Sequence, residues 1–431
     1  MQLHLGLPFI VMVLALLLGV PIPFALGIAG VIGIWIVTGN WNMVLGVLGM
    51  ESFSSTANYI LTTIPMFILM AHFSASGGLA RDLYAAASKW VSHIRGGLAI
   101  ATVFACMVFG AMSGASVAAA SVMAKIAMPE MRRFGYSESL AAGAIGVGST
   151  LDILIPPSVA MVVYGIVTQT SISKLLIAGV VPGFVLAIFL VLCILVWVTV
   201  SPSHAPKILN VSWAERWRTL LRVWPSILLI LIVLVLLYTG IATPTEVGAI
   251  GAAASALIGL AMGRLSWTGI VEAIKETACT TTMIFIILIG ANIFGAFMSL
   301  SRVPQQITAA VIDMGINRWV VIIGIVVVYF GVSMFMDEIP LMLLTLQLTF
   351  PLIIKLGFDP IWYGVLSMMM VSMGLVFPPV GMIAFIVSGT AKVNLMKVYQ
   401  GTSILTIAIV LTTVIMMIFP QIVLWLPSTM R

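Results

Sequence analysis

Glycine, hydroxyl and carboxyl residues interrupt apolar stretches of the chain, and such oxygen-rich breaks suit a monovalent cation. Lipid offers no partners for free backbone groups, so a helix broken at membrane depth must be buried by protein or line a cavity. Unwound carbonyls at such breaks can bind sodium. We predict sodium ligands at the following residues: Gly110, Ser113 and Gly114 facing Gly148, Ser149 and Thr150, and Ser333 and Asp337 facing Ser372 and Gly374. The alternative is that these small residues only allow close helix packing.

Two proline pairs, Pro156-Pro157 and Pro378-Pro379, follow two of these breaks. Proline lacks an amide donor and starts a new half-helix, whose N-terminal end carries partial positive charge and suits an anion. The alternative is a pair of kinked helices with a purely structural role. We predict that the residues contacting a ligand are Ser116, Asp152, Pro156, Pro157, Ser158, Pro378 and Pro379.

Three carboxylates lie within apolar segments of span length, where acids are costly and functional by default. Asp337 and Glu338 are adjacent, and Asp152 precedes the first proline pair. Lys125 is the only basic residue within a predicted hairpin, but it lies roughly 13 Å along a helix from Ser116, where a lysine extends to water. We therefore predict that Asp152 takes part in ion coupling or binds a cationic group. A neutral hydrogen-bonded acid and a water-filled site are the alternatives.

The composition is that of a polytopic membrane protein. Hydrophobic residues make up 62% of 431 positions and charged residues 7%, a balance that a soluble domain could not hide from water. Strand-like alternation is absent, so helices are the predicted spanning elements. The net charge of +6 does not suggest nucleic-acid binding. Three cysteines without paired spacing give neither a disulfide framework nor a metal site.

The apolar pattern predicts an all-α protein with about ten spans and two re-entrant hairpins. Residues 97–128 and 319–351 are the predicted hairpins, because 97–128 is too long for one span and contains a polar break, and 319–351 mirrors it. Residues 77–96 and 302–317 are predicted to lie in the membrane interface. The predicted spans are residues 5–20, 22–39, 59–76, 138–171, 176–200, 223–239, 246–262, 276–299, 360–390 and 400–426.

The chain also reads as a duplication with a fixed offset. PEMRRFGY begins at Pro129 and PLIIKLGF at Pro351, and 351 − 129 = 222, while the proline pairs give 378 − 156 = 222. Five predicted crossings separate the two hairpins, so the second copy must be inverted. Inverted repeats place a site where the two copies meet and expose it to either side in turn. Further identities at this offset are Gly135/Gly357, Thr168/Thr390 and Gly179/Gly401.

The distribution of basic residues predicts the orientation. If residues 77–96 are cytoplasmic, thirteen Lys and Arg residues fall in inside loops and five in outside loops, which is the positive-inside bias. Both termini then face outward. The polar stretch 201–222 joins the halves at the cytoplasmic surface, anchored by its Trp and Arg residues.

Several strings resemble the large membrane subunit of TRAP transporters, the tripartite ATP-independent periplasmic carriers: GAMSGASVAAA, LDILIPPS, FMDEIP and GLVFPPVGMIAFIVSG. The resemblance implies an ion-transporter-like fold with an elevator motion, sodium-driven uptake of a small organic acid, and no enzyme activity or cofactor beyond the coupling ion. It also implies a bacterial or archaeal cytoplasmic (inner) membrane. The implied partners are a small membrane subunit on a separate chain, since no four-helix segment precedes or follows, and a periplasmic substrate-binding protein. Asp152 departs from the glycine expected there, and its counterpart is Gly374.

The predicted moving and static parts follow from the breaks. Residues 97–204 and 319–431 hold both interrupted pairs and are the predicted transport domain. Residues 1–96 and 205–318 are the predicted scaffold.

Two other classes of protein remain as alternatives. An ion- or proton-coupled carrier working without a binding protein is the stronger one. An intramembrane serine protease is weak, because Ser113 needs a base in reach and the second half contains no histidine.

Overall fold

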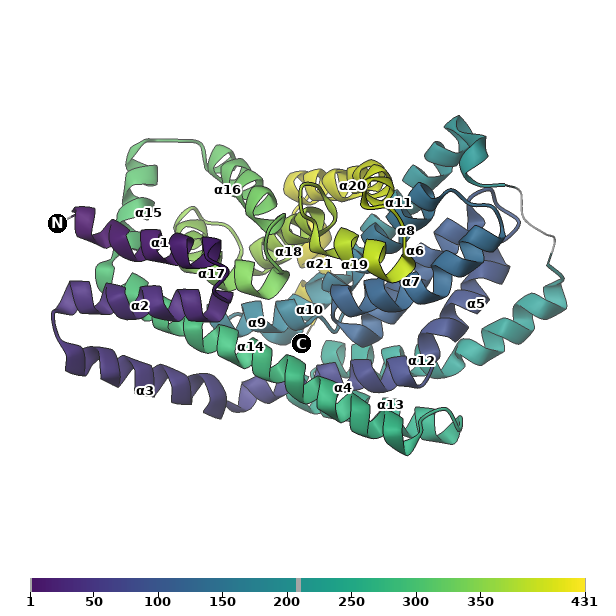
Figure 1. Cartoon of the computed structure of the whole chain (residues 1–431), viewed down its shortest axis with the longest axis horizontal. Coiled ribbons are helices and arrows are strands. Elements are labelled where there is room, and N and C mark those ends of the chain that lie inside the picture. The colour runs from purple at the N-terminus through teal and green to yellow at the C-terminus, as the bar shows by residue number, and fades with distance from the viewer. Residues whose placement is uncertain (1, 207–210, 431) are drawn as a thin grey trace.

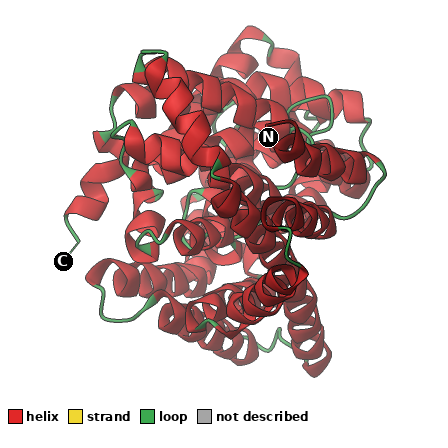
Figure 2. Cartoon of the chain, turned by 90° about the vertical axis from the view of Figure 1, so that its left-hand side faces the viewer, coloured by secondary structure: helices red, strands yellow, loops and turns green. Residues whose placement is uncertain are grey.

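The computed structural model describes residues 2–206 and 211–430, so the predicted linker 201–222 lies partly outside the described residues. Within these ranges every regular element is a helix, and the apolar sequence makes this the form that satisfies its backbone groups internally. Viewed from the left-hand side of Figure 1, the molecule consists of helices joined by loops (Figure 2). The prediction of an all-α protein is confirmed.

The first half contains these helices: α1 (Gln2–Leu17), α2 (Ile22–Thr38), α3 (Trp41–Ala57), η1 (Tyr59–Thr62), α4 (Thr63–Ser76), α5 (Leu79–Val91), α6 (Gly97–Ser113), α7 (Ser116–Arg133), α8 (Glu138–Ser149), η2 (Thr150–Ile153), α9 (Val159–Thr168), α10 (Ile172–Ala178), α11 (Val180–Val200) and η3 (Pro202–His204). The second half contains these helices: α12 (Trp213–Thr239), α13 (Pro244–Ala261), α14 (Trp267–Ser301), α15 (Val303–Asp313), α16 (Arg318–Ser333), α17 (Glu338–Lys355), α18 (Pro360–Val376), α19 (Met382–Ala391), α20 (Leu395–Ile418) and α21 (Gln421–Ser428).

Seven helices in the described ranges are long and apolar enough to cross a membrane, and several shorter apolar helices accompany them. The structure therefore supports a multi-pass membrane protein. The broken segments fall where they were predicted: α6 and α7 are separated at Gly114, and α16 and α17 at residues 334–337.

Several elements differ from the prediction: helix α14 begins nine residues before the predicted span 276–299, and the predicted span 400–426 is divided between α20 and α21. Helix α12 begins at Trp213, ten residues before the predicted span, so part of the predicted linker is helical. Helix α3 lies where no element was predicted, and its polar residues Glu51, Ser52 and Ser54 hide it from a hydropathy pattern. It leads through η1 into α4, and the three elements follow one another along the lower part of Figure 1.

The helices pack in two groups. Helices α1 to α4 pack with α13 and α14, which runs obliquely across Figure 1. Helices α6 to α8 pack with α11, α19 and α20, and α18 packs with α16 and α20. Helix α5 packs against α6 of the second group and against α12, which itself packs against α13 of the first group. Helix α5 therefore lies between the two groups.

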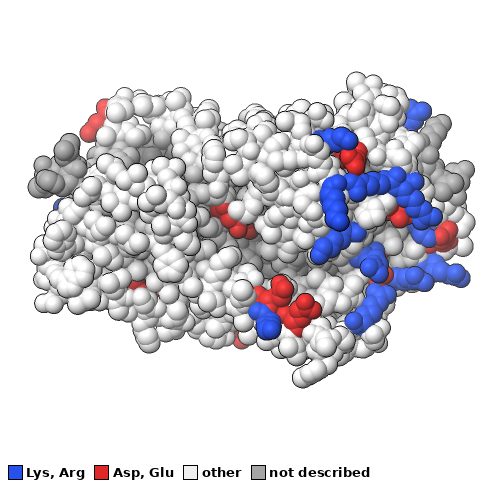
Figure 3. Space-filling model, viewed as in Figure 1, with Lys and Arg blue, Asp and Glu red and all other residues white. Residues whose placement is uncertain are grey.

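Basic side chains gather on one end of the molecule. In Figure 3 the Lys and Arg side chains of the visible face lie mainly at the right-hand end, where Figure 1 places α5 and the start of α12. Lys89 of α5 and Glu215 of α12 form an ion pair there, and Trp90 Nε1 donates to the Arg216 carbonyl oxygen at 3.2 Å. These contacts hold α5 on the first turns of α12.

Candidate functional site

The first hairpin tip docks on the first proline pair. Gly114 separates α6 from α7 with a φ of 62°, a left-handed conformation that glycine adopts without strain. Its carbonyl oxygen accepts a hydrogen bond from the Val159 backbone N–H at 3.3 Å. A Cβ at Gly114 would lie 2.6 Å from the Pro157 carbonyl oxygen, so the two backbones approach too closely for any side chain.

The second hairpin tip docks on the second proline pair in a similar way. The Gly381 N–H, just after Pro378-Pro379, donates to the Met334 carbonyl oxygen at 3.1 Å. Asp337 caps α17 by accepting from the Glu338 N–H at 2.9 Å. Pro156-Pro157 and Pro378-Pro379 both contain a cis peptide bond. In both halves, the hairpin tip packs against the proline-containing loop of the same half.

The two tips meet each other directly. Ser116, the first residue of α7, donates from its hydroxyl to a carboxyl oxygen of Glu338, the first residue of α17, at 3.3 Å. These residues are equivalent under the sequence offset, since 338 − 116 = 222. Helix α7 also packs on α19, and α17 packs on α9, so each hairpin contacts the broken helix of the other half.

Asp152 is fully buried beside the first tip. One carboxyl oxygen accepts from the Ser113 hydroxyl at 3.5 Å, and the other, Oδ1, has no partner among the described residues. A Cβ at Gly110 would lie 2.5 Å from the Asp152 Cβ, so Gly110 makes room for this side chain. The exposed Lys125 forms no recorded ion pair with it. Asp152 has 0% exposure, so its carboxyl is not open to bulk solvent.

In the second half, the counterpart of Asp152 is Gly374, and the side chain of Ser333 packs against it. Ser333 is buried against Gly374, where an added Cβ would lie 2.6 Å from the Ser333 Cβ. The Ser333 hydroxyl lies 2.9 Å from the Phe330 carbonyl oxygen and 3.3 Å from that of Met370. Asp152 and Gly374 are related by the offset, so the position that carries a carboxyl in one half carries no side chain in the other.

The other predicted ion ligands lie on helices α8, η2 and α18, which pack against the hairpins. The Ser149, Thr150 and Ser372 hydroxyls are buried and donate to carbonyl oxygens of their own helices at 2.7, 2.8 and 2.7 Å. Each hydroxyl oxygen keeps lone pairs that can accept or coordinate. Gly148 faces Cys106 of α6 across a space where a Cβ would lie 3.3 Å from the sulfur.

The two proline loops differ in exposure. Pro156, Pro157 and Ser158 are buried, and the Ser158 hydroxyl oxygen caps α9 by accepting from the Met161 N–H at 3.4 Å. Pro378 is half-buried and Pro379 is exposed.

Tyr399 of α20 holds the second proline loop and was not predicted from the sequence. Its hydroxyl lies 2.8 Å from the Pro379 carbonyl oxygen and 2.7 Å from that of Val380. A tyrosine at a helix start gives no local signal of such a contact.

The predicted ion ligands do not include a cluster of the side chains that bind divalent metals. Within residues 2–206 and 211–430, no group of three or more His, Cys, Asp or Glu residues could hold a metal ion. The tips instead present carbonyl and hydroxyl oxygens, which are suitable ligands for sodium.

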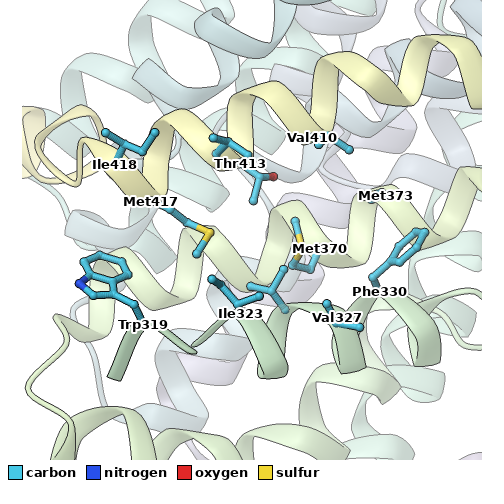
Figure 4. A pocket seen from close by; sticks show the side chains of 12 residues that line it. Trp319, Ile323, Val327, Phe330, Met370, Met373, Val410, Thr413, Met417 and Ile418 are labelled. Carbon is cyan, nitrogen blue, oxygen red and sulfur yellow. The ribbon is translucent and has the colours of Figure 1, made fainter. Parts of the chain in front are cut away.

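A separate apolar groove of about 620 Å³ lies between α16, α18 and α20 (Figure 4). Trp319, Phe330 and Met417 are among the side chains that line it, and Thr413 is the polar one. None of the predicted site residues lines this groove, so we do not place the polar site there.

A family model described as "Tripartite ATP-independent periplasmic transporter, DctM component" matches residues 9–422. The chain belongs to this family. It is 34% identical over 382 residues to the C4-dicarboxylate TRAP transporter large permease protein DctM of Pseudomonas aeruginosa, covering 88% of this chain and 89% of the relative. It is 33% identical to the ectoine TRAP transporter large permease protein TeaC of Halomonas elongata, covering 95% and 96%. The predicted TRAP resemblance is confirmed, and the protein is a TRAP large permease.

The fold is also similar to that of a solved transporter. The YdaH transporter of Alcanivorax borkumensis aligns with a TM-score of 0.62 and 12% sequence identity, covering 91% of this chain and 90% of that one. At this identity the likeness concerns the fold alone. The roles of individual residues in this TRAP permease stay predictions.

Proposed function

We propose that this TRAP large permease carries out sodium-driven uptake of a small organic acid that a periplasmic substrate-binding protein delivers. The observation that carries the proposal is the contact between the hairpin tips, where Ser116 meets Glu338 among unwound, oxygen-rich backbone. A site formed by two broken helices from two halves is the arrangement found in secondary transporters.

The proposed architecture is two inverted repeats with about ten spans and two re-entrant hairpins. The offset of 222 supports it, because residues 41–76 then correspond to residues 263–298. The first range is α3, η1 and α4, and the second falls within α14 apart from its first residues. In this proposal α3 and α4 form one bent span, so the added helix leaves the number of crossings unchanged.

The proposed motion is an elevator-like slide of residues 97–204 and 319–431 against residues 1–96 and 205–318. The two packing groups support this division. A cavity of about 430 Å³ lies at the proposed boundary, lined by Ser76 and Ala80 on one side and by Val122 and Ile126 of α7 on the other. A space there leaves the transport domain free to move along the scaffold.

Each tip is proposed to bind one sodium ion. Gly110, Ser113 and Gly114 with Gly148 to Thr150 form the first set, and Ser333 and Asp337 with Ser372 and Gly374 form the second. Buried hydroxyls with free lone pairs support both sets.

The proposed substrate class follows from relatives and from the helix ends. Relatives are named for C4-dicarboxylates, ectoine and sialic acid, all of which carry a carboxylate. Helices α7 and α19 start without a side-chain cap, so their first N–H groups remain available to a carboxylate.

The proposed complex contains a separate small membrane subunit in the cytoplasmic (inner) membrane. The basic end of the molecule in Figure 3 is then cytoplasmic and both termini are periplasmic. The Trp213 and Trp217 side chains, 66% and 55% exposed, suit an interfacial position.

The test is uptake by proteoliposomes that contain the large permease and its small subunit. We expect uptake only when both the binding protein and an inward sodium gradient are present, because the tips require both substrate delivery and ions. Rapid uptake of free substrate without the binding protein would contradict the tripartite mechanism and favour the simpler ion- or proton-coupled carrier.

A further inference from the structure

Three carboxylates lie together where the hairpin tips meet. Glu338 is 7% exposed and bonded to Ser116, Asp337 is adjacent in the chain, and Asp152 is buried. Asp152 and Glu338 accept hydrogen bonds from Ser113 and Ser116, which are three residues apart at the first tip. None of the three forms an ion pair in the described part of the chain. The tips therefore hold acidic side chains that no basic side chain of the described residues pairs with.

The Asp152 carboxyl supplies a second, independent observation. It has 0% exposure and its Oδ1 atom has no hydrogen-bond partner in the described ranges. Leaving a buried carboxyl oxygen unpaired costs free energy. The side chain is held beside the tip by Ser113, with Gly110 making room for it. The geometry thus presents a free acceptor at the meeting point of the tips.

The occupant of this acceptor must bring positive charge and hydrogen-bond donors. A divalent metal does not fit, because the described residues provide no group of three metal-ligating side chains. Sodium already has proposed ligands among the carbonyl and hydroxyl oxygens of each tip. An ammonium or amidinium group carries both the positive charge and the N–H donors that suit carboxyl oxygens such as those of Asp152 and Glu338.

We propose that Asp152 and Glu338 form a binding site for the cationic group of a zwitterionic substrate, whose carboxylate lies at the uncapped helix starts. This inference rests on the proposed function and narrows its substrate class, from organic acids in general to acids that also carry a positive nitrogen. Carboxylates face the cation and helix N-terminal ends face the anion, so one molecule satisfies both ends of the site. A plain dicarboxylate brings no N–H group that could donate to the unpaired Asp152 oxygen.

The test compares matched ligands on the complete membrane complex in lipid nanodiscs. β-Alanine and butyrate differ in an ammonium against a methyl group, and 4-aminobutyrate and pentanoate differ in the same way with a longer spacer. In the presence of sodium, we expect at least one zwitterion to raise the midpoint temperature of thermal unfolding of the complex. The other member of its pair, which lacks the positive nitrogen, should leave this midpoint unchanged. Equal midpoints within both pairs would overturn the inference, as would stabilisation by sodium with no further effect of either zwitterion.

Two site variants and one control variant test whether the zwitterion-dependent shift in the unfolding midpoint comes from Asp152 and Glu338. Asp152→Asn should abolish the zwitterion-dependent shift, and Glu338→Gln should weaken it while keeping an oxygen that accepts from Ser116. Glu338→Gln carries the same test if the Asp152 variant does not fold. The exposed Asp313 at the end of α15 provides the control, since Asp313→Asn also removes one acid but lies outside the site. A zwitterion shift that survives in both site variants would contradict the proposal.

The outcome is separable from that of the proposed function. Binding-protein-dependent uptake together with equal midpoints would reject the zwitterion site alone. Uptake that needs no binding protein would reject the tripartite mechanism, whatever the midpoints show.

Discussion

Replacing Gly374 with alanine is expected to separate the second hairpin tip from α18. The added Cβ would lie 2.6 Å from the Ser333 Cβ and 2.7 Å from the Ser333 carbonyl carbon. Because one of these atoms belongs to the backbone, a change of rotamer cannot relieve the overlap. Inserting a methyl group into a close-packed site of this kind costs about 1–3 kcal/mol. The tip must shift, and we expect sodium-dependent uptake to fall with it.

Gly331→Ala is the matched control in the same hairpin. Gly331 lies within α16 and an added Cβ there would meet no atom within 4 Å. Alanine is favoured over glycine inside a helix by about 0.5–1 kcal/mol, so this variant should be at least as stable as the wild type. The two variants should therefore differ by about 2–4 kcal/mol in the free energy of unfolding.

The measurement is equilibrium unfolding in mixed micelles, with uptake by proteoliposomes in parallel. Equal stability of Gly374→Ala and Gly331→Ala would refute the packing of the second tip against α18. A Gly374→Ala protein that is less stable yet transports normally would show that this contact is structural and not part of the transport site.

Two further substitutions test other contacts. Gly114→Ala should abolish most uptake, because its φ of 62° disfavours a side chain and the Cβ would overlap the Pro157 carbonyl oxygen; normal uptake would contradict docking of the first tip. Glu138→Gln should lower the free energy of unfolding by less than about 1 kcal/mol, because its ion pairs with Arg132 and Lys397 are partly exposed. That loss should shrink in high salt, and a larger, salt-independent loss in the unfolding measurement would contradict this interpretation.

The sequence predicted the helical class, the family and the location of both broken segments, because these depend on local apolar length and on glycine and proline. The start of α12 was predicted too late, since the amphipathic turns at Trp213 to Arg222 are polar on one side. Helix α3 was missed because its polar residues Glu51, Ser52 and Ser54 lower its hydropathy. The number of spans and the inverted repeat stay predictions, supported by the fixed offset.

The structure brings some of the predicted site residues together, while their roles stay predictions. Gly110 and Ser113 both contact Asp152, and Ser333 contacts Gly374. Contacts made only by the folded chain gave no sequence signal. Tyr399 holding the second proline loop is one example. The bond between Ser116 and Glu338 joins positions 222 residues apart, and the sequence did not indicate that equivalent residues touch.

The central claim is that the transport domain slides past the scaffold and carries the joined tips with it. It is tested most directly by cysteine cross-linking across the cavity between Ser76 and helix α7, after replacement of the native cysteines. Ala118, Val122 and Ile126 follow one another at one-turn intervals on a half-buried stripe of α7, about 6 Å apart.

We expect a cysteine at position 76 to cross-link to more than one of these positions, in proportions that change when sodium is added. Each cross-link should block uptake until it is reduced. Cross-linking to a single position, with the same yield in all conditions and with uptake intact, would contradict the slide.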